Sequence, residues 1–320
     1  MKRILPMLVL AAGALAALTL HAQPYPNQPV RIIAPFAAGG GTDFIARLIA
    51  QTLTEKLGAQ VIVENKPGAG GNLGAEQAIR APADGYTLLL VAGSYTVNPS
   101  LYKLTFDPVN DITPIIQLSQ GPFIVTVHPS VPARTLKEFI DLVKKQPDKL
   151  SYGSAGSGSV THLASALFLD MTNLKIVHIP YKGTGPALND AIAGNVQVLF
   201  GSPATTIQHV KSGRLRALAV TTGSRIAAAP EVPTVAESGV PGYEVVLWHG
   251  LVGPKGLPRP IVERINSEAN AILKVKEMDA LLAQDGVSAA GGTPEQFAAT
   301  IKGDIERWRK IVQQAGVKLD

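Results

Sequence analysis

The chain has 320 residues, of which 46% are hydrophobic and 17% charged, with a formal net charge of +5 and no cysteine. The lack of cysteine excludes disulfides, thiolate metal sites and cysteine nucleophiles, and the absence of a basic cluster gives little support to nucleic-acid binding. A chain of this length can bury a large core and commonly divides into two lobes.

The first residues predict an export signal. Lys2 and Arg3 precede an apolar run over residues 4–20, and Ala22 is followed by a proline-rich segment at 23–26. This order is typical of a secretory signal peptide, residues 1–22, with cleavage near Ala22. A cleaved signal is favoured over an uncleaved anchor because a proline and a glycine interrupt the apolar run. The mature protein is then expected to be soluble.

Strands and helices alternate along the rest of the chain, which is the pattern of an α/β fold. The predicted strands cover residues 30–34, 61–64, 87–91, 151–154, 175–179 and 196–200, and the predicted helices 42–56, 73–79, 135–145, 160–171, a segment ending near 194, and the region from 261 onward. Two long β-rich runs, 115–127 and 243–252, are candidate crossings between lobes. Two crossings make the first lobe discontinuous, with residues 23–120 plus 246–320, and leave 121–245 to the second lobe.

The first strand runs through a glycine turn into a helix, and this junction predicts an anion site. Gly39, Gly40 and Gly41 let a ligand approach the backbone, and the first amides of the helix that opens near Thr42 lack intrahelical partners. A carboxylate and a phosphate are both compatible with such a site. The alternative is that the glycines only meet a backbone requirement and hold no ligand.

The middle of the chain contains two more junctions in which a strand runs through a glycine-containing turn into a helix. A Gly/Ser turn at 154–159 precedes the helix that begins near Val160, and a third turn at 181–185 precedes a helix with Pro186 in its first turn. Hydroxyl groups accompany the exposed amides, those of Thr42, Ser157, Ser159, Thr161 and Thr184. Because open α/β sheets bind ligands at the carboxyl ends of their strands, these turns predict a shared cleft between two lobes.

The sequence lacks the common motifs of phosphate-binding proteins and of hydrolases. No Gly-Lys-Ser/Thr ending of a P-loop occurs, and none of the glycine turns completes the pattern G-x-G-x-x-G. No serine stands in G-x-S-x-G, and no histidine pair has metal-binding spacing, so we expect neither a metal nor a cofactor. A secreted hydrolase or lyase that uses Ser157 and His162 in the same cleft remains the alternative from another class.

Three polar residues near the turns have two interpretations each. Asp43 either pairs with Arg47 and complements its helix N-terminus, or faces the cleft and receives an ammonium group or a bridging water. Lys182 either contacts an acidic ligand or is an ordinary exposed lysine. His162 either donates a hydrogen bond to the ligand or packs in the first turn of its helix.

Together these motifs resemble the Bug family, the periplasmic solute receptors of tripartite tricarboxylate transporters. The resemblance spans nearly the whole mature chain and is carried by PFAAGGGTD with the following AR, VENKPGAGG, YGSAGSG with the following HL, PYKGTGP, VPTVAESG and WHG, at residues 35–43, 46–47, 63–71, 152–158, 162–163, 180–186, 232–239 and 248–250.

The resemblance implies a type II periplasmic-binding-protein fold, in which two α/β lobes joined by two crossover strands close over a small organic carboxylate. It implies a periplasmic, non-enzymatic receptor, and we expect a monomer whose partners are the membrane components of such a transporter or a sensor kinase. The ligand-binding residues it predicts are Phe36, Ala37, Ala38, Gly39, Gly40, Thr42, Asp43, Ser94, Ser154, Gly156, Ser157, Gly158, Ser159, Thr161, His162, Tyr181, Lys182, Gly183, Thr184, Gly201 and Ser202.

Overall fold

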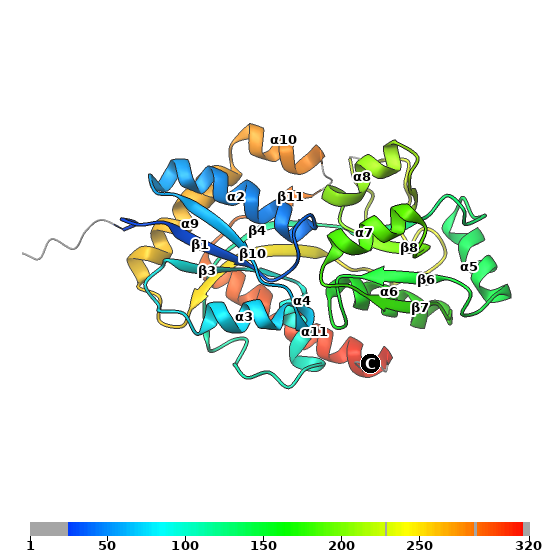
Figure 1. The fold of residues 1–320 in the computed structure, drawn as a ribbon, viewed down its shortest axis with the longest axis horizontal. Coiled ribbons are helices and arrows are strands. Elements are labelled where there is room, and N and C mark those ends of the chain that lie inside the picture. The colour runs from blue at the N-terminus through cyan, green and yellow to red at the C-terminus, as the bar shows by residue number, and fades with distance from the viewer. Residues whose placement is uncertain (1–24, 228, 285–286, 316–320) are drawn as a thin grey trace, which may run out of the picture.

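The chain folds into two β-sheets, each with helices on both faces, which lie side by side in Figure 1. This computed structural model describes residues 25–227, 229–284 and 287–315, so the predicted signal peptide at 1–22 lies outside the described residues. The predicted α/β fold with two lobes is confirmed. None of the described helices combines the length and apolar character that crossing a bilayer requires.

The first sheet has the strand order β11-β4-β10-β3-β1-β2, and we call this half of the molecule lobe 1. Strands β1, β2 and β3 pair in parallel, whereas β10 is antiparallel to both β3 and β4. The sheet therefore contains strands from both ends of the chain. Its strands are β1 (Val30–Ala34), β2 (Val61–Asn65), β3 (Thr87–Ala92), β4 (Ile112–Gly121), β10 (Leu247–Pro254) and β11 (Ser288–Ala289).

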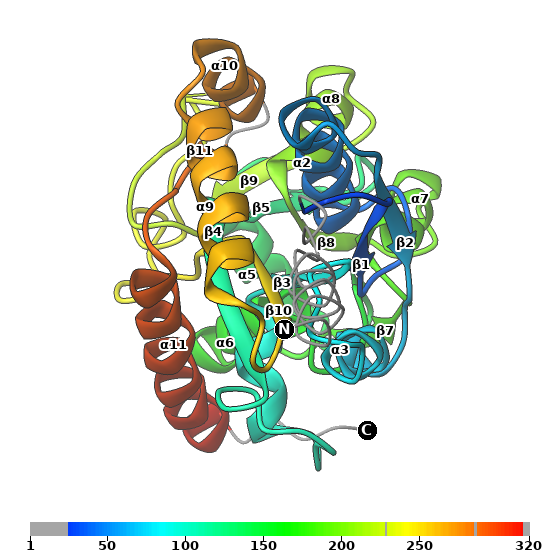
Figure 2. The same ribbon diagram turned by 90° about the vertical axis from the view of Figure 1, so that its left-hand side faces the viewer.

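Helices cover both faces of the first sheet, because its central strand β3 buries every side chain and needs apolar cover on each side. Helices α2, α9 and α10 pack on one face, and α3 and α11 on the other. In Figure 2 α2 and α10 lie above the sheet, and α3 and α11 below. The helices of lobe 1 are α2 (Gly41–Leu57), α3 (Asn72–Ile79), α4 (Ser94–Val97), α9 (Arg259–Leu273), α10 (Lys276–Gln284) and α11 (Pro294–Ala315), with short 3-10 turns η1 (Ala69–Gly71) and η2 (Asn98–Ser100).

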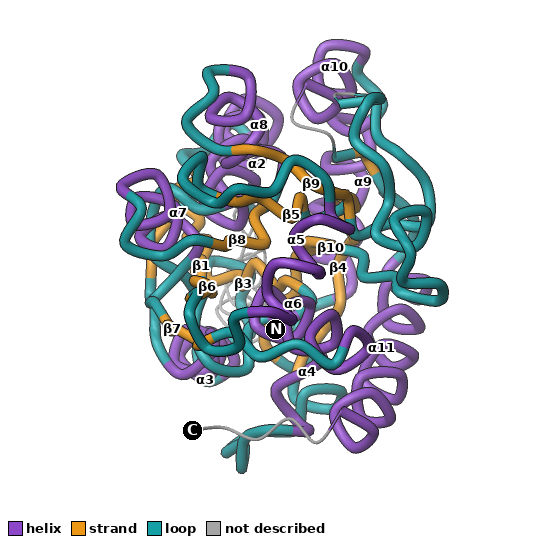
Figure 3. Tube along the Cα trace, turned by 90° about the vertical axis from the view of Figure 1, so that its right-hand side faces the viewer, coloured by secondary structure: helices purple, strands orange, loops and turns teal. Residues whose placement is uncertain are grey.

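The second sheet has the order β7-β6-β8-β5-β9 and forms lobe 2. Strands β6, β7 and β8 are parallel, and β5 runs antiparallel between β8 and β9. Helices α7 and α8 lie on one side of this sheet and α6 on the other (Figure 3). The elements are β5 (Ile124–Val127), α5 (Leu136–Lys145), β6 (Ser151–Ser154), α6 (Val160–Thr172), β7 (Val177–Pro180), α7 (Thr184–Ala193), β8 (Val198–Gly201), α8 (Pro203–Lys211) and β9 (Arg216–Val220).

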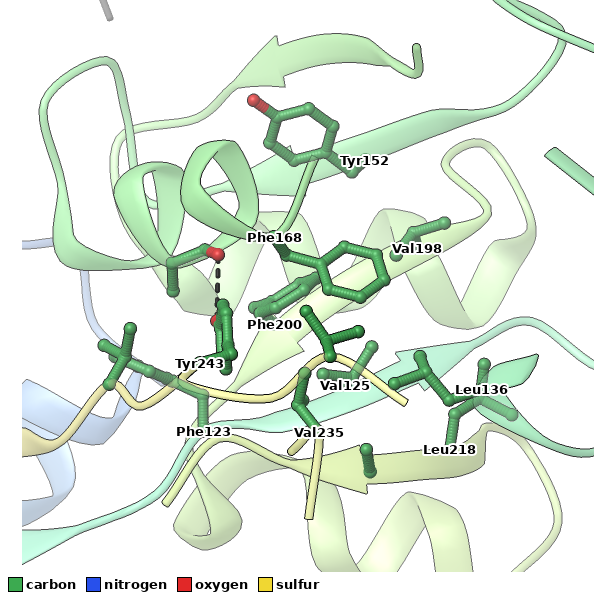
Figure 4. Packing of buried hydrophobic residues seen from close by; sticks show 14 of the residues in the cluster. Phe123, Val125, Leu136, Tyr152, Phe168, Val198, Phe200, Leu218, Val235 and Tyr243 are labelled. Atoms are coloured by element: carbon green, nitrogen blue, oxygen red, sulfur yellow. Dashed lines mark hydrogen bonds between the residues drawn. The ribbon is translucent and has the colours of Figure 1, made fainter. Parts of the chain in front are cut away.

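An aromatic cluster fills the core of lobe 2, as Figure 4 shows. The Phe168 ring of α6 lies 5.9 Å from Phe200 on β8 and meets Tyr243 edge-on at 6.2 Å, geometries that aromatic pairs favour. Tyr243 is fully buried, and its hydroxyl donates to the Ala164 carbonyl oxygen at 2.9 Å. This bond fastens the segment that leads into β10 onto α6.

Two chain segments cross between the lobes, one from β4 to β5 and one into β10. Thr221, just after β9, joins them, because its hydroxyl accepts from the Phe123 amide at 2.7 Å and donates to the Val245 carbonyl at 2.8 Å. Helix α11 adds a third link, since Trp308 and Val312 near its end pack into the core of lobe 2.

The predicted elements agree closely with the observed ones. The strand at 30–34 matches to the residue, and the run at 115–127 divides into β4 and β5 where Pro122 interrupts it. The sequence analysis missed β9, β11, α4 and α8. The residue limits proposed for the two lobes, 23–120 with 246–320 and 121–245, stay a prediction.

Replacing Tyr243 by Phe should lower the free energy of unfolding by about 1 kcal/mol, because the buried hydrogen bond from the Tyr243 hydroxyl to the Ala164 carbonyl is lost. Urea denaturation would show a lower midpoint with an unchanged slope. Tyr86→Phe is the matched control, since the Tyr86 hydroxyl bonds Asn27 at the exposed surface and its loss should cost less. Equal midpoints for the Tyr243 variant and the parent would contradict this role.

Candidate functional site

Four helices begin at the cleft between the lobes. Strands β1, β6, β7 and β8 each end there, and the chain turns directly into α2, α6, α7 and α8. A helix start carries roughly half a positive charge and exposes amides without intrahelical partners. The fold thus collects several partial positive charges from both lobes at one place.

The wall from lobe 1 is the turn that leads into α2. Gly40 is the N-cap and has no side chain to cap the helix, so the first amides stay open toward the cleft. Thr42 follows in the first turn, and its side chain faces the cavity described below. The predicted glycine turn at the start of α2 is therefore part of the cleft.

Asp43 holds this turn in place. Its Oδ2 accepts from the Gly39 amide at 3.1 Å and from Arg47 Nε at 3.0 Å, and its Oδ1 accepts from Asn65 Nδ2 at 3.0 Å. Burial raises the pKa of Asp43, but the hydrogen bonds from Arg47, Gly39 and Asn65 outweigh it and leave the pKa below its usual range. All these partners of the Asp43 carboxylate belong to lobe 1. The bond to Arg47 is the one expected in the first of the two interpretations of Asp43.

The wall from lobe 2 is the turn before α6. Ser159 caps the helix by accepting from the His162 amide at 3.2 Å, and Thr161 Oγ1 accepts from the Ala155 amide at 2.9 Å. His162 Nδ1 accepts from the Gly158 amide at 3.1 Å. The imidazole of His162 stacks on that of His178, with ring centres 4.1 Å apart. His162 therefore stabilises the turn through its bond to the Gly158 amide.

The third turn closes against lobe 1. The Ala37 amide donates to the Lys182 carbonyl oxygen at 3.0 Å, while the Lys182 side chain is exposed. The Tyr181 hydroxyl donates at 2.5 Å to Asp190 on α7, the helix that follows this turn. Burial, followed by the Asp190 hydrogen bond and charge, raises the pKa of Tyr181 to about 12. The next helix start contributes Ser202 to the cleft.

Between these walls lies a cavity of about 30 Å³, room for two or three water molecules. Eight predicted ligand residues line it: Phe36, Gly40, Thr42, Ser94, Ser159, Thr161, Thr184 and Ser202. Thirteen others do not: Ala37, Ala38, Gly39, Asp43, Ser154, Gly156, Ser157, Gly158, His162, Tyr181, Lys182, Gly183 and Gly201. Seven lining residues were not predicted: Gly41, Ala92, Phe123, Ala155, Val160, Leu247 and His249.

His249 is the polar residue that the sequence analysis missed. It lies on β10, with Nδ1 3.1 Å from Ser119 Oγ on β4 and Nε2 3.5 Å from Thr42 Oγ1. Burial lowers the pKa of His249 to about 3, so the ring is neutral at ordinary pH. Its position inside a predicted crossing, residues 243–252, was the signal that could have placed it at the cleft.

The chemistry of the cavity is that of an anion site without a formal cation. Among the residues that the structure describes, those lining it include no Lys, Arg, Asp or Glu. Helix amides and hydroxyls can hold a carboxylate, and the apolar side chains, among them Phe123 and Leu247, can surround its body. Nowhere in the described part of the chain do three His, Asp or Glu residues gather as a metal site would need.

The fold and cleft together define a two-lobed binding protein of the periplasmic type. The structure of Rpa4515 from R. palustris with adipate is 34% identical, with a TM-score of 0.89 over 92% of this chain and 99% of that one. MatC from Rhodopseudomonas palustris with bound malate is 31% identical, with a TM-score of 0.86 over 90% of this chain and 100% of that one.

The family model for tripartite tricarboxylate transporter family receptors matches residues 45–317. Protein BugT of Bordetella pertussis is 34% identical over 323 aligned positions, which cover 100% of this chain and 99% of that protein. The chain belongs to the tripartite tricarboxylate transporter receptor family. The resemblance seen in the sequence motifs is thereby confirmed.

His249 should make the folded state less stable as the pH falls. Unfolded histidine binds a proton below pH 6.5, whereas folded His249 does so only near pH 3, so between these values the unfolded state holds more protons. Between pH 7 and pH 5 the parent should lose up to about 2 kcal/mol more stability than His249→Asn. Urea denaturation at both pH values measures this, and parallel losses would show that His249 is not buried in neutral form.

Proposed function

We propose that the chain is a periplasmic receptor that closes around a small organic carboxylate and delivers it to the membrane components of a tripartite tricarboxylate transporter. The observation that carries this proposal is the convergence of helix starts from both lobes on one cavity without a charged side chain. Family membership and the adipate and malate in the two related structures support the carboxylate class.

Closure couples binding to delivery. A ligand that touches Thr42 of lobe 1 and Ser202 of lobe 2 gains contacts in the closed state that the open state lacks, and so shifts the population toward closure. The crossings around Phe123 and Val245 would absorb the rotation, and the transporter would recognise the closed surface.

The enzyme alternative receives no support from the cleft. Ser157 and His162, the residues it requires, do not line the cavity, and His162 Nδ1 accepts from the Gly158 amide. A general base must reach the proton that it abstracts from the substrate or nucleophile. We therefore propose binding and release of unchanged ligand.

The receptor proposal predicts that a suitable acid raises the melting temperature and reduces the radius of gyration. At a ligand concentration of 100 times Kd, the stabilisation is about 2.7 kcal/mol, which corresponds to several degrees. A panel of mono-, di- and tricarboxylates and amino acids, starting with malate and adipate, tests this by thermal shift and X-ray scattering. A panel without a single responding compound would rule against the proposal.

Gly41→Ala should block closure without harming the fold. Gly41 begins α2, where Ala is acceptable, but its Cβ would lie 2.4 Å from Ser202 Oγ and 2.9 Å from Ser202 Cβ across the cleft. We expect the melting temperature without ligand to stay within about 2 °C of the parent and the affinity to fall at least about tenfold, because the clash exists only in the closed state.

Two further variants make this test specific. Ser202→Gly combined with Gly41→Ala removes the clashing side chain and should recover part of the affinity. Gly303→Ala in α11, where a Cβ meets nothing within 4 Å, is the matched control and should bind like the parent. Isothermal titration calorimetry with the strongest acid from the panel gives Kd for all four proteins. If Gly41→Ala binds the acid as tightly as the parent, the close approach of Gly41 to Ser202 in the ligand-bound state is contradicted.

A further inference from the structure

The glycine turns predicted to hold the ligand also serve as contacts between the lobes. In one such contact, the Ala37 amide of lobe 1 donates to the Lys182 carbonyl of lobe 2 at 3.0 Å. A Cβ on Gly185 would lie 2.6 Å from the Ala38 carbonyl oxygen, so only glycine allows this approach. This contact joins the lobes backbone against backbone.

A second contact between the lobes is made by a side chain, that of Tyr102. Its hydroxyl donates to the Ser157 carbonyl oxygen, 55 residues away on lobe 2. Its ring covers Gly158, where an added Cβ would lie 2.6 Å from the Tyr102 Cε2 atom. Burial raises the pKa of Tyr102, so the hydroxyl keeps its proton and remains a donor at neutral pH.

Tyr102 is firmly attached to lobe 1. Its amide donates to the Asn98 carbonyl at 2.8 Å. The Asn98 side chain, which is 2% exposed, donates to the Gly70 carbonyl at 3.1 Å and to Asn72 Oδ1 at 2.6 Å. The tyrosine therefore sits on a buried hydrogen-bonded base and would move with lobe 1 when the cleft opens.

The partner of Tyr102 is the turn that shapes the wall of lobe 2. Ser157 and Gly158 stand directly before Ser159, the N-cap of α6, which lines the cavity. Tyr102 itself does not line it. A bond that joins the two lobes is made in the closed state and broken in the open one, so it changes ligand affinity without touching the ligand.

We propose that Tyr102 is a positioning residue that sets ligand affinity by holding lobe 2 closed and its α6 turn in register. This inference rests on the proposed receptor function. On this proposal, the hydrogen bond of Tyr102, which lies outside the cavity, stabilises the closed state in addition to the contacts that the ligand makes. It also predicts that slow ligand release depends on this hydroxyl.

Tyr102→Phe removes only the hydroxyl and tests the proposal. Kd for the panel acid that binds the parent should rise about three- to tenfold, the range expected for one net hydrogen bond. Stopped-flow kinetics should place the change in the dissociation rate, with the association rate within about twofold of the parent. The melting temperature without ligand should stay within about 2 °C, which a merely structural tyrosine would not allow.

Tyr25→Phe is the matched control. The Tyr25 hydroxyl donates to the Gly85 carbonyl at 2.8 Å, again from a tyrosine to a backbone oxygen, but within lobe 1. Its loss should lower the melting temperature and leave Kd unchanged. Equal Kd values for Tyr102→Phe and the parent, with clear binding by the parent, would overturn the Tyr102 inference and leave the receptor function intact.

A measurement without ligand separates the two proposals. Because the chain has no cysteine, Glu55→Cys on α2 and Lys144→Cys on α5 allow a spin label on each lobe. Tyr102→Phe should shift the distance distribution of the labelled protein away from the closed state. If malate, adipate and the rest of the panel fail to bind the parent, this distribution still decides the Tyr102 inference, and an unchanged distribution would refute it.

Discussion

The fold gathers backbone amides, in place of cationic side chains, at one cleft, and the anion binding proposed above requires this arrangement. A helix start offers amides only at its tip, so a ligand can use several of them only if several helices point at it. Two mixed sheets that lie side by side meet this condition, because α2 follows a parallel strand of one sheet and α6, α7 and α8 follow strands of the other. The requirement explains why the cavity residues that the structure describes carry hydroxyls and no formal charge.

The same requirement makes the cleft sensitive to small distances. Amides reach a ligand only where side chains leave space, and the glycines of the turns allow both ligand approach and contact between the lobes. Gly41 faces Ser202, and Gly185 faces Ala38, each at a distance that a methyl group would forbid in the closed state. The proposed closure therefore requires a steric fit between the lobes, backbone against side chain at Gly41 and backbone against backbone at Gly185, as well as a response to the ligand.

Much of this fold could be predicted from the sequence, because its signals are local. Periodicity and turn chemistry located β1, α2, β6 and α6 to within a residue or two. The turns were also recognised as parts of a cleft. The roles of individual residues depended on contacts between segments far apart in the chain. Asp43, expected near the ligand as one alternative, is occupied by Arg47 and Asn65, and the latter lies 22 residues away.

His249 and Tyr102 show what cannot be predicted from the sequence for physical reasons. His249 owes its neutral state to burial between β4 and α2, and the role proposed for Tyr102 depends on a carbonyl on the opposite lobe. Neither property can be read from neighbouring residues in the sequence. Both residues lie where the two lobes or their connecting strands meet, and at such places burial and distance are set by the closed arrangement. In a two-lobed receptor, the residues that control closure are therefore found from the assembled cleft, after its turns have been recognised in the sequence.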